Sequence, residues 1–400
     1  MISVDEALDI ILDNIRPVGT EKTNIQDALG GVLAKDICSS VNIPEYDNSS
    51  MDGFAVRAQD TKGASVNSPK TLHVVDQIQA GIFSKKTVEQ NQAIQIMTGS
   101  IMPRGSNAVV MAEDTEFDEE IVHIKKQVNE SENVRKVGEN IKKGSLVIEK
   151  GKVLDAASLG VLASLGKSKI DVSKKPRVAL LITGDEIIEI DEPFVEGKAR
   201  NSNAYALSAQ IEETGCISVN KGIVRDDLDA IKQKLKECRD CDAIITCGGV
   251  SAGNYDFVKE AVEAIGGEIK FHKIKMKPGK PNLFAIWNEI PIFGLPGNPV
   301  SSMVSFEILV KPALQQMMGC PSTIRNEIDT ILNEDFVTHD PRQHFLRAQT
   351  RWEGNRYVSR LTGPQGSGIL NSMLLANSLV ILPENTQKAN KGDTFKAILL

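Results

Sequence analysis

The 400-residue chain lacks any hydrophobic run long enough to cross a membrane. Its apolar runs, such as Val178–Ile182, extend over a few residues, whereas a bilayer-spanning helix needs about 20. The N-terminal Met-Ile-Ser-Val-Asp-Glu has neither the basic nor the apolar stretch of a secretory signal. We therefore expect a cytoplasmic protein that makes no contact with a membrane.

Cysteine and histidine are also scarce, with six and five residues. Six cysteines in a chain of this length are too few for a disulfide framework. Cys238 and Cys241 form one Cys-x-x-Cys, but no second pair and no histidine pair accompanies it, so a zinc site is not predicted. These counts favour a reduced, intracellular protein.

An excess of positive charge is missing as well. Lys and Arg number 46 against 53 Asp and Glu, which gives a net charge of −7. An acidic chain is a poor electrostatic match to nucleic acid or anionic lipid, so neither is expected as a partner. The composition, 41% hydrophobic and 25% charged, is typical of globular proteins. An anionic ligand would need a local basic cluster.

The N-terminal part alternates between helical and β-like patterns. Ser3–Ile15 has helical apolar spacing and a Ser3/Glu6 capping box, and further helices are predicted near Ile25–Ala34 and at Leu154–Leu165, the last capped by Asp155. Between Val41 and Val137 the chain has short β-like runs at Gly53–Val56, Leu72–Val75, Ile94–Met97, Ala108–Met111 and Ile121–Ile124. A β-rich module is therefore predicted between two flanks that pack together.

From Arg177 onward, strands and helices alternate. Strands are predicted at Val178–Thr183, Ser218–Val224, Ala243–Thr246, Leu283–Ile286 and Ile292–Leu295, and helices at Ala204–Glu213, Asp226–Glu237 (capped by Asp226), Asp256–Ala264 and Val300–Met317. This alternation is typical of a parallel, doubly wound α/β sheet. After Cys320, the strands Phe345–Thr350, Tyr357–Leu361, Leu379–Leu382 and Thr394–Leu399 predict a small β-barrel or sandwich.

Loops rich in glycine follow several of the α/β strands: Thr183–Glu186, Gly248–Asp256 and Gly294–Ser301. Ligands of open α/β sheets bind beyond the carboxyl ends of the strands. Glycines let backbone amides approach an anion, and a helix N-terminus adds a favourable dipole. A single glycine turn is ordinary punctuation between strand and helix, but three at one sheet edge favour a phosphate-bearing ligand. No Walker A motif or Rossmann fingerprint is present.

A basic segment, His272–Pro281, contains Lys273, Lys275, Lys277 and Lys280. If the segment is extended, alternation places the first three lysines on one face. A solvated, charged edge strand is one interpretation. The nearby glycine loops favour the other, an oxyanion site.

The loop Pro44–Ala55 is dense in polar side chains packed beside Met51 and Phe54. Such a loop is costly to bury without hydrogen-bond partners. It is either a turn or part of a site that offers carboxylates for metal binding or proton transfer.

Together these segments resemble the molybdopterin molybdenumtransferase family, the insertases of the molybdenum cofactor. The matching segments run nearly end to end in the family's order: Pro44–Ala55, Thr98-Gly99, Gly184-Asp185-Glu186, Asn201-Ser202-Asn203, Gly248–Asp256, Lys277–Pro281, Leu295–Pro299 and Gly363–Ser367. The resemblance implies four domains: an elongated helical linker domain (1–43 and 137–173), an inserted β-rich module (44–136), a molybdopterin-binding α/β domain (174–319) and a C-terminal β-barrel (320–400).

The resemblance also implies the reaction, which is Mg²⁺-dependent insertion of molybdate into adenylylated molybdopterin with release of AMP. Members of the family are homodimers whose sites combine residues of both copies. A molybdopterin adenylyltransferase is the expected upstream donor, and molybdoenzymes or their chaperones are the expected acceptors.

Site residues follow from the motif matches. The pterin-adenylate would be held by Thr183, Asp185, Glu186, Gly248, Gly249, Ser251, Asp256, Pro281, Pro296, Asn298 and Pro299, with Glu186 or Asp256 as metal ligands. Molybdate and phosphate would be bound by Lys273, Lys277, Lys280, Arg347 and Ser367. A second copy would supply Asp52, Thr98 and Asn140. The residues expected to be catalytic are Asp52, Thr98, Asn140, Glu186 and Asp256.

One position departs from the family pattern. In the segment Arg135–Ile141, Asn140 stands where the family has Asp. Asparagine cannot act as a base and is a weaker metal ligand, so loss of a general base here would lower the rate by about 10²–10⁴. Glu139 is adjacent but would point the other way if the stretch is extended. We expect activity at a reduced level.

Three alternative functions remain open from the sequence. Asn140 favours a non-catalytic, pterin-binding paralogue or scaffold. Tungstate is a tetrahedral dianion of similar size, so a tungstate-specific insertase is a second alternative. A molybdopterin adenylyltransferase is the third, although the β-module and the barrel argue against it.

Overall fold

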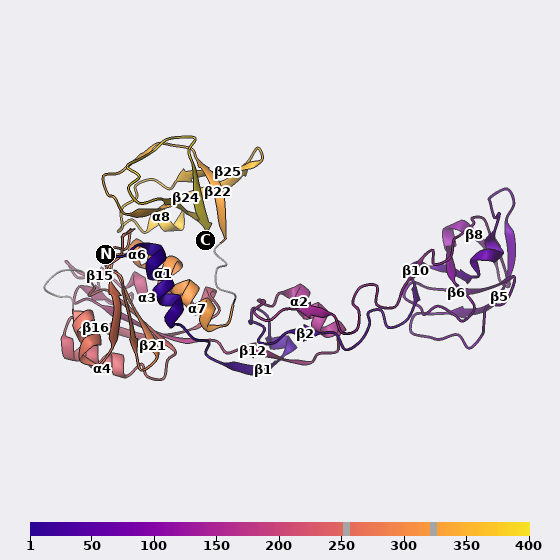
Figure 1. Cartoon of the computed structure of the whole chain (residues 1–400), viewed down its shortest axis with the longest axis horizontal. Helices are drawn as coiled ribbons and strands as arrows, with labels where there is room; N and C mark the ends of the chain where they lie inside the picture. Colours follow the sequence, from indigo (N-terminus) through magenta and orange to yellow (C-terminus); the bar gives the residue numbers. More distant parts are fainter. Residues whose placement is uncertain (251–256, 321–325) are drawn as a thin grey trace. The chain divides into compact units, whose positions relative to one another are not determined.

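The computed structural model describes residues 1–250, 257–320 and 326–400, and the chain forms two compact units (Figure 1). The first unit comprises Met1–Lys35, Gly151–Leu159 and Lys169–Leu400, and the second comprises Asp36–Lys150 and Gly160–Ser168. A long middle segment is thus inserted into the first unit. The four domain boundaries given above remain predictions.

The first unit is built on a mixed sheet with the strand order β16-β13-β17-β21-β20-β18. These strands are β13 (Arg177–Thr183), β16 (Ile217–Val224), β17 (Ala243–Cys247), β18 (Glu268–His272), β20 (Leu283–Trp287) and β21 (Ile290–Leu295). β16, β13, β17 and β21 are parallel, as predicted. The other edge is antiparallel, because Asn288 and Glu289 form a two-residue turn with positive φ that pairs β20 with β21.

Helices flank this sheet, namely α1 (Val4–Asn14), α3 (Ser202–Glu213), α4 (Leu228–Lys236), α5 (Phe257–Ala264), α6 (Pro299–Ser305) and α7 (Lys311–Met317). The π-helical turn Phe306–Val310 joins α6 to α7, so the helix predicted at Val300–Met317 is continuous. Pro312 lacks an N–H and cannot complete a regular α-helical turn, which accounts for the wider turn before it.

Two of the three predicted helix caps are present in the structure. Ser3 caps α1 by accepting the N–H of Glu6, and Asp155 accepts the N–H of Ser158 at the start of α2 (Ala156–Ser164), both as predicted. The cap predicted at Asp226 is wrong, because Asp227 accepts the N–H of Ala230 and α4 begins one residue later. Asp226 is thereby left at the sheet edge.

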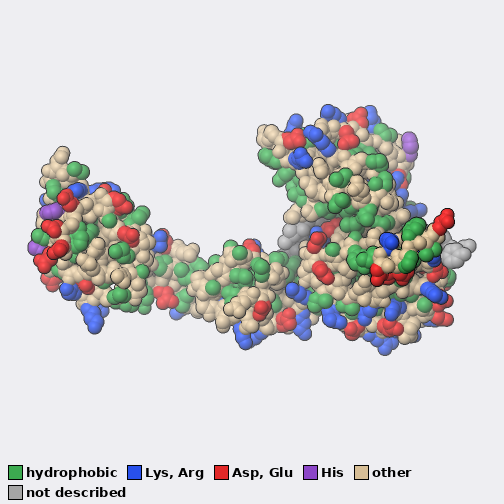
Figure 2. All heavy atoms as spheres, turned by 180° about the vertical axis from the view of Figure 1, so that it is seen from behind, with side chains coloured by type: hydrophobic (Ala, Val, Ile, Leu, Met, Phe, Trp, Pro, Cys, Tyr) green, Lys and Arg blue, Asp and Glu red, His purple; other side chains and the backbone are tan. Residues whose placement is uncertain are grey.

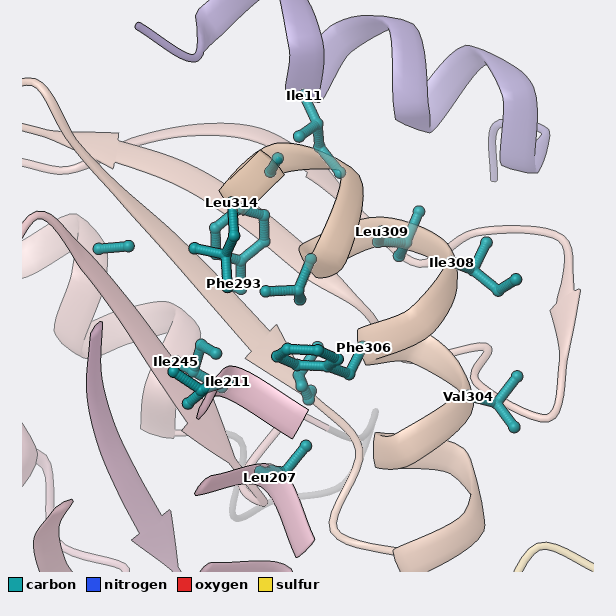
Figure 3. Close-up of a cluster of buried hydrophobic side chains, with 14 of the residues drawn as sticks. Ile11, Leu207, Ile211, Ile245, Phe293, Val304, Phe306, Ile308, Leu309 and Leu314 are labelled. Carbon is teal, nitrogen blue, oxygen red and sulfur yellow. The ribbon is translucent and has the colours of Figure 1, made fainter. Parts of the chain in front are cut away.

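The core of the first unit joins segments from distant parts of the sequence. Ile11 of α1 lies over Leu314 of α7, and both are fully buried (Figure 3). Phe293 of β21 and Phe306 lie in the same apolar cluster. The N-terminal helix is therefore part of the α/β core.

The two flanks of the insertion also pair, as expected, through antiparallel strands β1 (Thr20–Asn24) and β12 (Lys169–Ser173). The helix predicted at Ile25–Ala34 is wrong: only a 3₁₀ turn, Ile25–Asp27, forms there. Gly30 has φ +73° and ends helical geometry, and the following residues bond instead to strands, as Leu33 does through its N–H to the Lys152 carbonyl.

The C-terminal strands β22 (Glu327–Leu332), β24 (Gln343–Glu353), β25 (Arg356–Leu361), β26 (Ser378–Leu382) and β28 (Thr394–Leu399) close into a barrel. Closure follows because β24 pairs with both β25 and β26. The barrel prediction is confirmed over the sandwich. The short strand β19 (Met276–Lys277) pairs with β24, which attaches the lysine segment to the barrel. The remaining elements of the barrel region are β23 (Phe336–Val337), β27 (Lys388–Ala389) and α8 (Asn371–Leu374).

The second unit is β-rich, as predicted, with a sheet ordered β7-β4-β6-β5-β9-β8. These strands are β4 (Gly53–Val56), β5 (Lys70–Ile78), β6 (Gln92–Ile96), β7 (Ala108–Met111), β8 (Thr115–Asp118) and β9 (Ile121–Ile124). Two short ladders accompany it: β3 (Asn48–Ser49) pairs with β10 (Val134–Arg135), and β2 (Ile37–Cys38) pairs with β11 (Leu146–Ile148). The polar loop Pro44–Ala55 thus leads into a buried strand.

Surface and cysteine chemistry agree with the composition. Among the described residues, no helix is long and apolar enough to span a bilayer. On the face drawn in Figure 2, basic side chains alternate with acidic ones. All six cysteines are free thiols, so the expected absence of a disulfide framework is confirmed.

Truncating the core side chain Ile11 to Ala should lower the free energy of unfolding by about 2–5 kcal/mol, because its site joins α1 to α7 and cannot collapse fully. Urea unfolding followed by the fluorescence of Trp287 and Trp352, both in the first unit, measures this. The control Asp9→Ala, on the exposed face of α1, should stay within about 0.5 kcal/mol of the unmodified chain. Equal losses in both variants would contradict the packing described.

Candidate active site

A cavity of about 480 Å³ lies at the carboxyl ends of β13 and β17, between which the strand order reverses. This is the position at which open α/β sheets bind ligands. We call it the glycine-loop cavity, and its walls include Thr183, Gly184, Glu186, Arg200, Ser202, Asn203, Asp226, Gly248, Gly249, Pro281, Pro296, Gly297, Asn298 and Pro299. Most of the residues that the resemblance assigned to the pterin-adenylate are therefore brought together here.

Close packing at Thr183 shapes one wall. Gly248 has φ +103°, and a Cβ atom there would lie 2.4 Å from the Thr183 carbonyl oxygen. Gly249, with φ +62°, also abuts the Thr183 side chain. Only glycines permit this approach. The Thr183 hydroxyl is buried and has no hydrogen-bond partner among the described residues, so it is a group that a ligand can satisfy.

A neighbouring wall, formed by the loop before α6, is held by hydrogen bonds. The Asn203 side-chain amide donates to the Gly297 carbonyl at 2.7 Å, and the Cys247 thiol donates to the Pro296 carbonyl at 3.3 Å. Burial raises the pKa of Cys247 to about 12, so this thiol is not a nucleophile at neutral pH. Its contribution is to position the loop before α6.

Acidic side chains gather at the cavity rim. Glu186 and Asp226 line the cavity, and Asp185 and Asp226 each accept the other's backbone N–H at 3.4 Å. Burial raises the pKa of Asp226, and the negative charges of Asp185 and Glu186 raise it further. Asp226 was predicted to cap a helix and was therefore not predicted as a residue of the site. Its place directly after β16, at the same sheet edge as Thr183, was the signal available in the sequence.

Arg200, also not predicted, places a cation in the cavity wall. It lies in β15 (Ala199–Arg200), which pairs with β14 (Ile187–Ile188). Its guanidinium donates to the carbonyls of Glu189, Ile190 and Glu192. Arg200 thus ties the loop between these two strands to the cavity.

The lysines divide between different surroundings. Lys277 and Lys280 line another cavity, of about 550 Å³, with Asp340 and Arg342; we call it the lysine cavity. Lys277 Nζ lies 3.2 Å from Asp340 Oδ2. Hydrogen bonds from the Arg342 side chain, aided by Lys277, hold the pKa of Asp340 well below its usual range. The cavity therefore keeps an excess of positive charge.

The expected continuous lysine strand is wrong. Lys273 has φ +71° and interrupts the extended backbone between β18 and β19, so alternation does not place the lysines on one face. Lys275 pairs with Glu384 at 3.2 Å. Lys273 lines neither the glycine-loop cavity nor the lysine cavity.

Arg347 lies in β24 and is only 1% exposed. Its Nε donates to the Ser372 hydroxyl and its Nη2 to the Gly366 carbonyl, both at 3.1 Å, and it forms no ion pair with a described residue. Burial lowers its pKa to about 10, so it still carries a charge at neutral pH. The backbone carbonyl of Ser367, in the same loop, accepts the N–H of Val300 in α6 at 3.2 Å. A buried cation without an acid partner is suited to an anion.

In the second unit, the structure pairs Asp52 with Thr98. Thr98 donates its backbone N–H (2.6 Å) and its hydroxyl (2.8 Å) to Asp52 Oδ1. These two bonds lower the pKa of Asp52. The carboxylate is therefore ionised and fixed in place.

A further cavity of the second unit, of about 470 Å³, is lined by Ile43, Pro44, Asn48, Arg135, Glu139 and Asn140; we call it the turn cavity. Glu139 and Asn140 both line this cavity, and the condition under which Glu139 was expected to point away, an extended chain, is not met. The chain turns at Gly138, which has φ +70°, and is not extended there.

Ser251 and Asp256 lie outside the described residues. Within the described part of the chain, no group of three or more His, Cys, Asp or Glu residues has the arrangement of a metal site. The assignment of Glu186 and Asp256 as metal ligands stays a prediction.

Known families match almost the whole chain. Residues 2–166 match the MoeA N-terminal region (domain I and II), residues 179–316 a probable molybdopterin binding domain, and residues 330–400 the MoeA C-terminal region (domain IV).

Full-length relatives agree. The chain is 35% identical over 402 residues to a molybdopterin molybdenumtransferase of Staphylococcus epidermidis, covering 100% of this chain and 95% of the relative. The molybdopterin molybdenumtransferase of Bacillus subtilis is 35% identical over 409 residues, with coverage of 100% and 94%. The chain belongs to the molybdopterin molybdenumtransferase family. This enzyme acts in molybdenum cofactor biosynthesis, and its substrate is related to molybdopterin.

The fold matches as well. The crystal structure of the molybdopterin biosynthesis moeA protein from Pyrococcus horikoshii OT3 superimposes with a TM-score of 0.87 at 31% identity, covering all of both chains. The enzyme therefore has a MoeA-like fold, with an α/β domain, β-rich parts and a C-terminal barrel.

Replacing Asp226 by Asn should raise the thermal unfolding midpoint at neutral pH. A carboxyl whose folded-state pKa is raised destabilises the fold once it ionises, and Asn removes that charge. Below the unfolded-state pKa, Asp226 is neutral in both the folded and the unfolded chain. The increase in the unfolding midpoint should therefore shrink as the pH falls through the raised pKa. Scanning calorimetry at several pH values tests this, with exposed Asp229→Asn as control. A gain that does not vary with pH would contradict it.

Proposed function

We propose that the enzyme inserts molybdate into adenylylated molybdopterin and releases AMP, with the help of Mg²⁺. One observation carries the proposal: the first unit combines a glycine-lined cavity at the switch point of its sheet with a surplus of positive charge in the lysine cavity and at Arg347. A ligand with a phosphate, and a small oxyanion, are the two chemistries that such features suit.

The glycine-loop cavity is the proposed place for the adenylylated pterin. Its volume of about 480 Å³ falls within the ~300–1,000 Å³ of small-molecule sites. Because Gly248 and Gly249 have no side chains, a phosphate can approach their backbone, and the unpartnered Thr183 hydroxyl can donate to it. Asn203 holds the loop that contains Gly297, so this wall of the cavity is in place before a ligand binds.

Molybdate is a tetrahedral dianion and needs several cationic donors. Lys277 and Lys280 present ammonium groups in the lysine cavity, and Arg347 presents a guanidinium held at two of its nitrogens. A guanidinium makes paired, charge-assisted bonds to oxyanions, which favours orientation as well as binding. We assign these residues to molybdate and phosphate binding.

Mg²⁺ fits the acidic rim of the glycine-loop cavity. This ion is usually held by one or two carboxylates together with substrate phosphates. Glu186 and Asp226 line the cavity. Burial raises the pKa of Asp226, the negative charges of Asp185 and Glu186 raise it further, and a cation would offset that negative charge. Glu186 and Asp226 would hold the ion. Asp256, which the family motif also assigns to the metal, lies outside the described residues. When bound, the ion offsets negative charge on the phosphates as AMP leaves.

The molybdate step can be tested by measuring AMP release from adenylylated molybdopterin, with Mg²⁺ and with or without molybdate. We expect release to require both. Lys280→Ala should raise the molybdate concentration needed for half-maximal rate by about 10- to 100-fold, the effect of losing one charge-assisted hydrogen bond. Lys391→Ala, exposed on the barrel, is the control.

Binding of the pterin without any AMP release would support the non-catalytic alternative. Release with tungstate but not molybdate would identify the tungstate-specific one.

We further propose a homodimer in which a second copy contributes Asp52, Thr98 and the turn cavity. These groups belong to the second unit, whereas the glycine-loop and lysine cavities belong to the first. A molybdopterin adenylyltransferase would deliver the substrate, and molybdoenzymes or their chaperones would receive the product.

Light scattering should give a mass close to twice the 43.5 kDa of one chain. As a functional check, a mixture of an inactive Asp52→Asn chain and an inactive Arg347→Ala chain should regain activity, because one of the two mixed sites is then intact. A mass of one chain, or no regained activity, would count against a shared site.

A further inference from the structure

The turn cavity presents a carboxylate that the sequence pattern hides. The chain reverses at residues 136–140, where the Glu139 N–H donates to the Lys136 carbonyl at 3.0 Å and the Lys136 N–H donates to Glu139 Oε2 at 2.8 Å. One carboxylate oxygen thus closes the turn. The other forms no hydrogen bond with a described residue and belongs to a side chain that lines the cavity.

Hydrogen bonds to a neighbouring segment fix this turn. The N–H of Gly138 donates to the Pro44 carbonyl, and the N–H of Asn140 donates to the Ile43 carbonyl, both at 3.0 Å. Ile43 and Pro44 are themselves walls of the cavity. Glu139 and Asn140, which both line the cavity, are therefore part of a fixed turn.

Lys136, at the start of the turn, pairs with Asp47 and not with Glu139. Lys136 Nζ lies 3.0 Å from Asp47 Oδ2, and the N–H of Val137 donates to Asp47 Oδ1 at 2.9 Å. Although burial alone would raise it, the pKa of Asp47 is lowered by these contacts, so Asp47 is ionised and paired with Lys136. Glu139 forms no ion pair with a described residue.

We infer that Glu139 supplies the carboxylate that this cavity presents to the substrate, in place of an acid at position 140. The inference rests on the proposed function, because it takes the substrate to be adenylylated molybdopterin. Replacement of one acid by its neighbour is possible here because the turn, unlike a strand, directs consecutive side chains into one cavity. The carboxylate thus stands at position 139 instead of position 140 and still belongs to the same site.

Moving the carboxylate from position 139 to position 140 tests the role of Glu139. Glu139→Gln keeps an oxygen that can accept the Lys136 N–H, so the turn is retained while the charge is lost. We expect kcat/KM for AMP release, and the equilibrium affinity for adenylylated molybdopterin, to fall by about 10- to 100-fold, as for loss of a charge-assisted contact. The double variant Glu139→Gln with Asn140→Asp restores a carboxylate to the cavity and should recover to within about threefold of the unmodified enzyme.

Glu132→Gln is the matched control. Glu132 Oε2 accepts the Asn129 N–H at 2.8 Å, the same three-residue arrangement as in the Glu139 turn, but Glu132 does not line the cavity. A purely structural role would make the two Gln variants alike and leave the double variant unrescued. Either result would overturn the inference.

The affinity measurement separates this inference from the proposed function. If the unmodified enzyme binds the substrate and releases no AMP, the proposed function fails, and Glu139 is judged from affinity alone. Unchanged affinity in Glu139→Gln would then reject its role. Weakened affinity, recovered in the double variant, would uphold it.

Discussion

The approach of Gly248 to the carbonyl oxygen of Thr183 is the constraint on which the glycine-loop cavity depends. Two parallel strands end side by side, and the loop after one must pass over the last residue of the other. A side chain at Gly248 would push the loop away from Thr183, and the cavity wall would open. This contact also shields the Thr183 hydroxyl from other protein partners, which leaves it for a ligand. The same few atoms therefore determine how the backbone packs and which hydroxyl a ligand can contact.

Charge is the second organising feature. The chain is acidic overall, yet two of the cavities contain side chains of both charge signs. Glu186, Asp226 and Arg200 all line the glycine-loop cavity, and Asp340 pairs with Lys277 and Arg342 in the lysine cavity. Arg347 stands apart, because it is buried with neutral partners only. Such a cation is costly unless an anion arrives, so its burial is better explained by binding than by stability.

Much of the fold could be predicted from sequence because its signals are local. Apolar periodicity located most strands and helices, and the caps at Ser3 and Asp155 could be read directly. Errors arose where a neighbour or a turn decided the outcome. Gly30 ended a helical pattern, the turn at Asn288 reversed a strand, and Asp227 took the cap from Asp226. Each of these is a competition between adjacent residues that periodicity cannot resolve.

By itself, the sequence determined the kinds of element, the order of the motifs and the family, because these depend on residue types and their spacing. Only the tertiary structure decided which motif residues share a cavity. It separated Lys273 from Lys277, brought Asp226 and Arg200 into the glycine-loop cavity, and placed Glu139 with Asn140 in the lining of the turn cavity. The reason is physical: side-chain direction depends on backbone angles at single positions such as Gly138 and Lys273, and on strands that are distant in sequence and meet at one sheet edge.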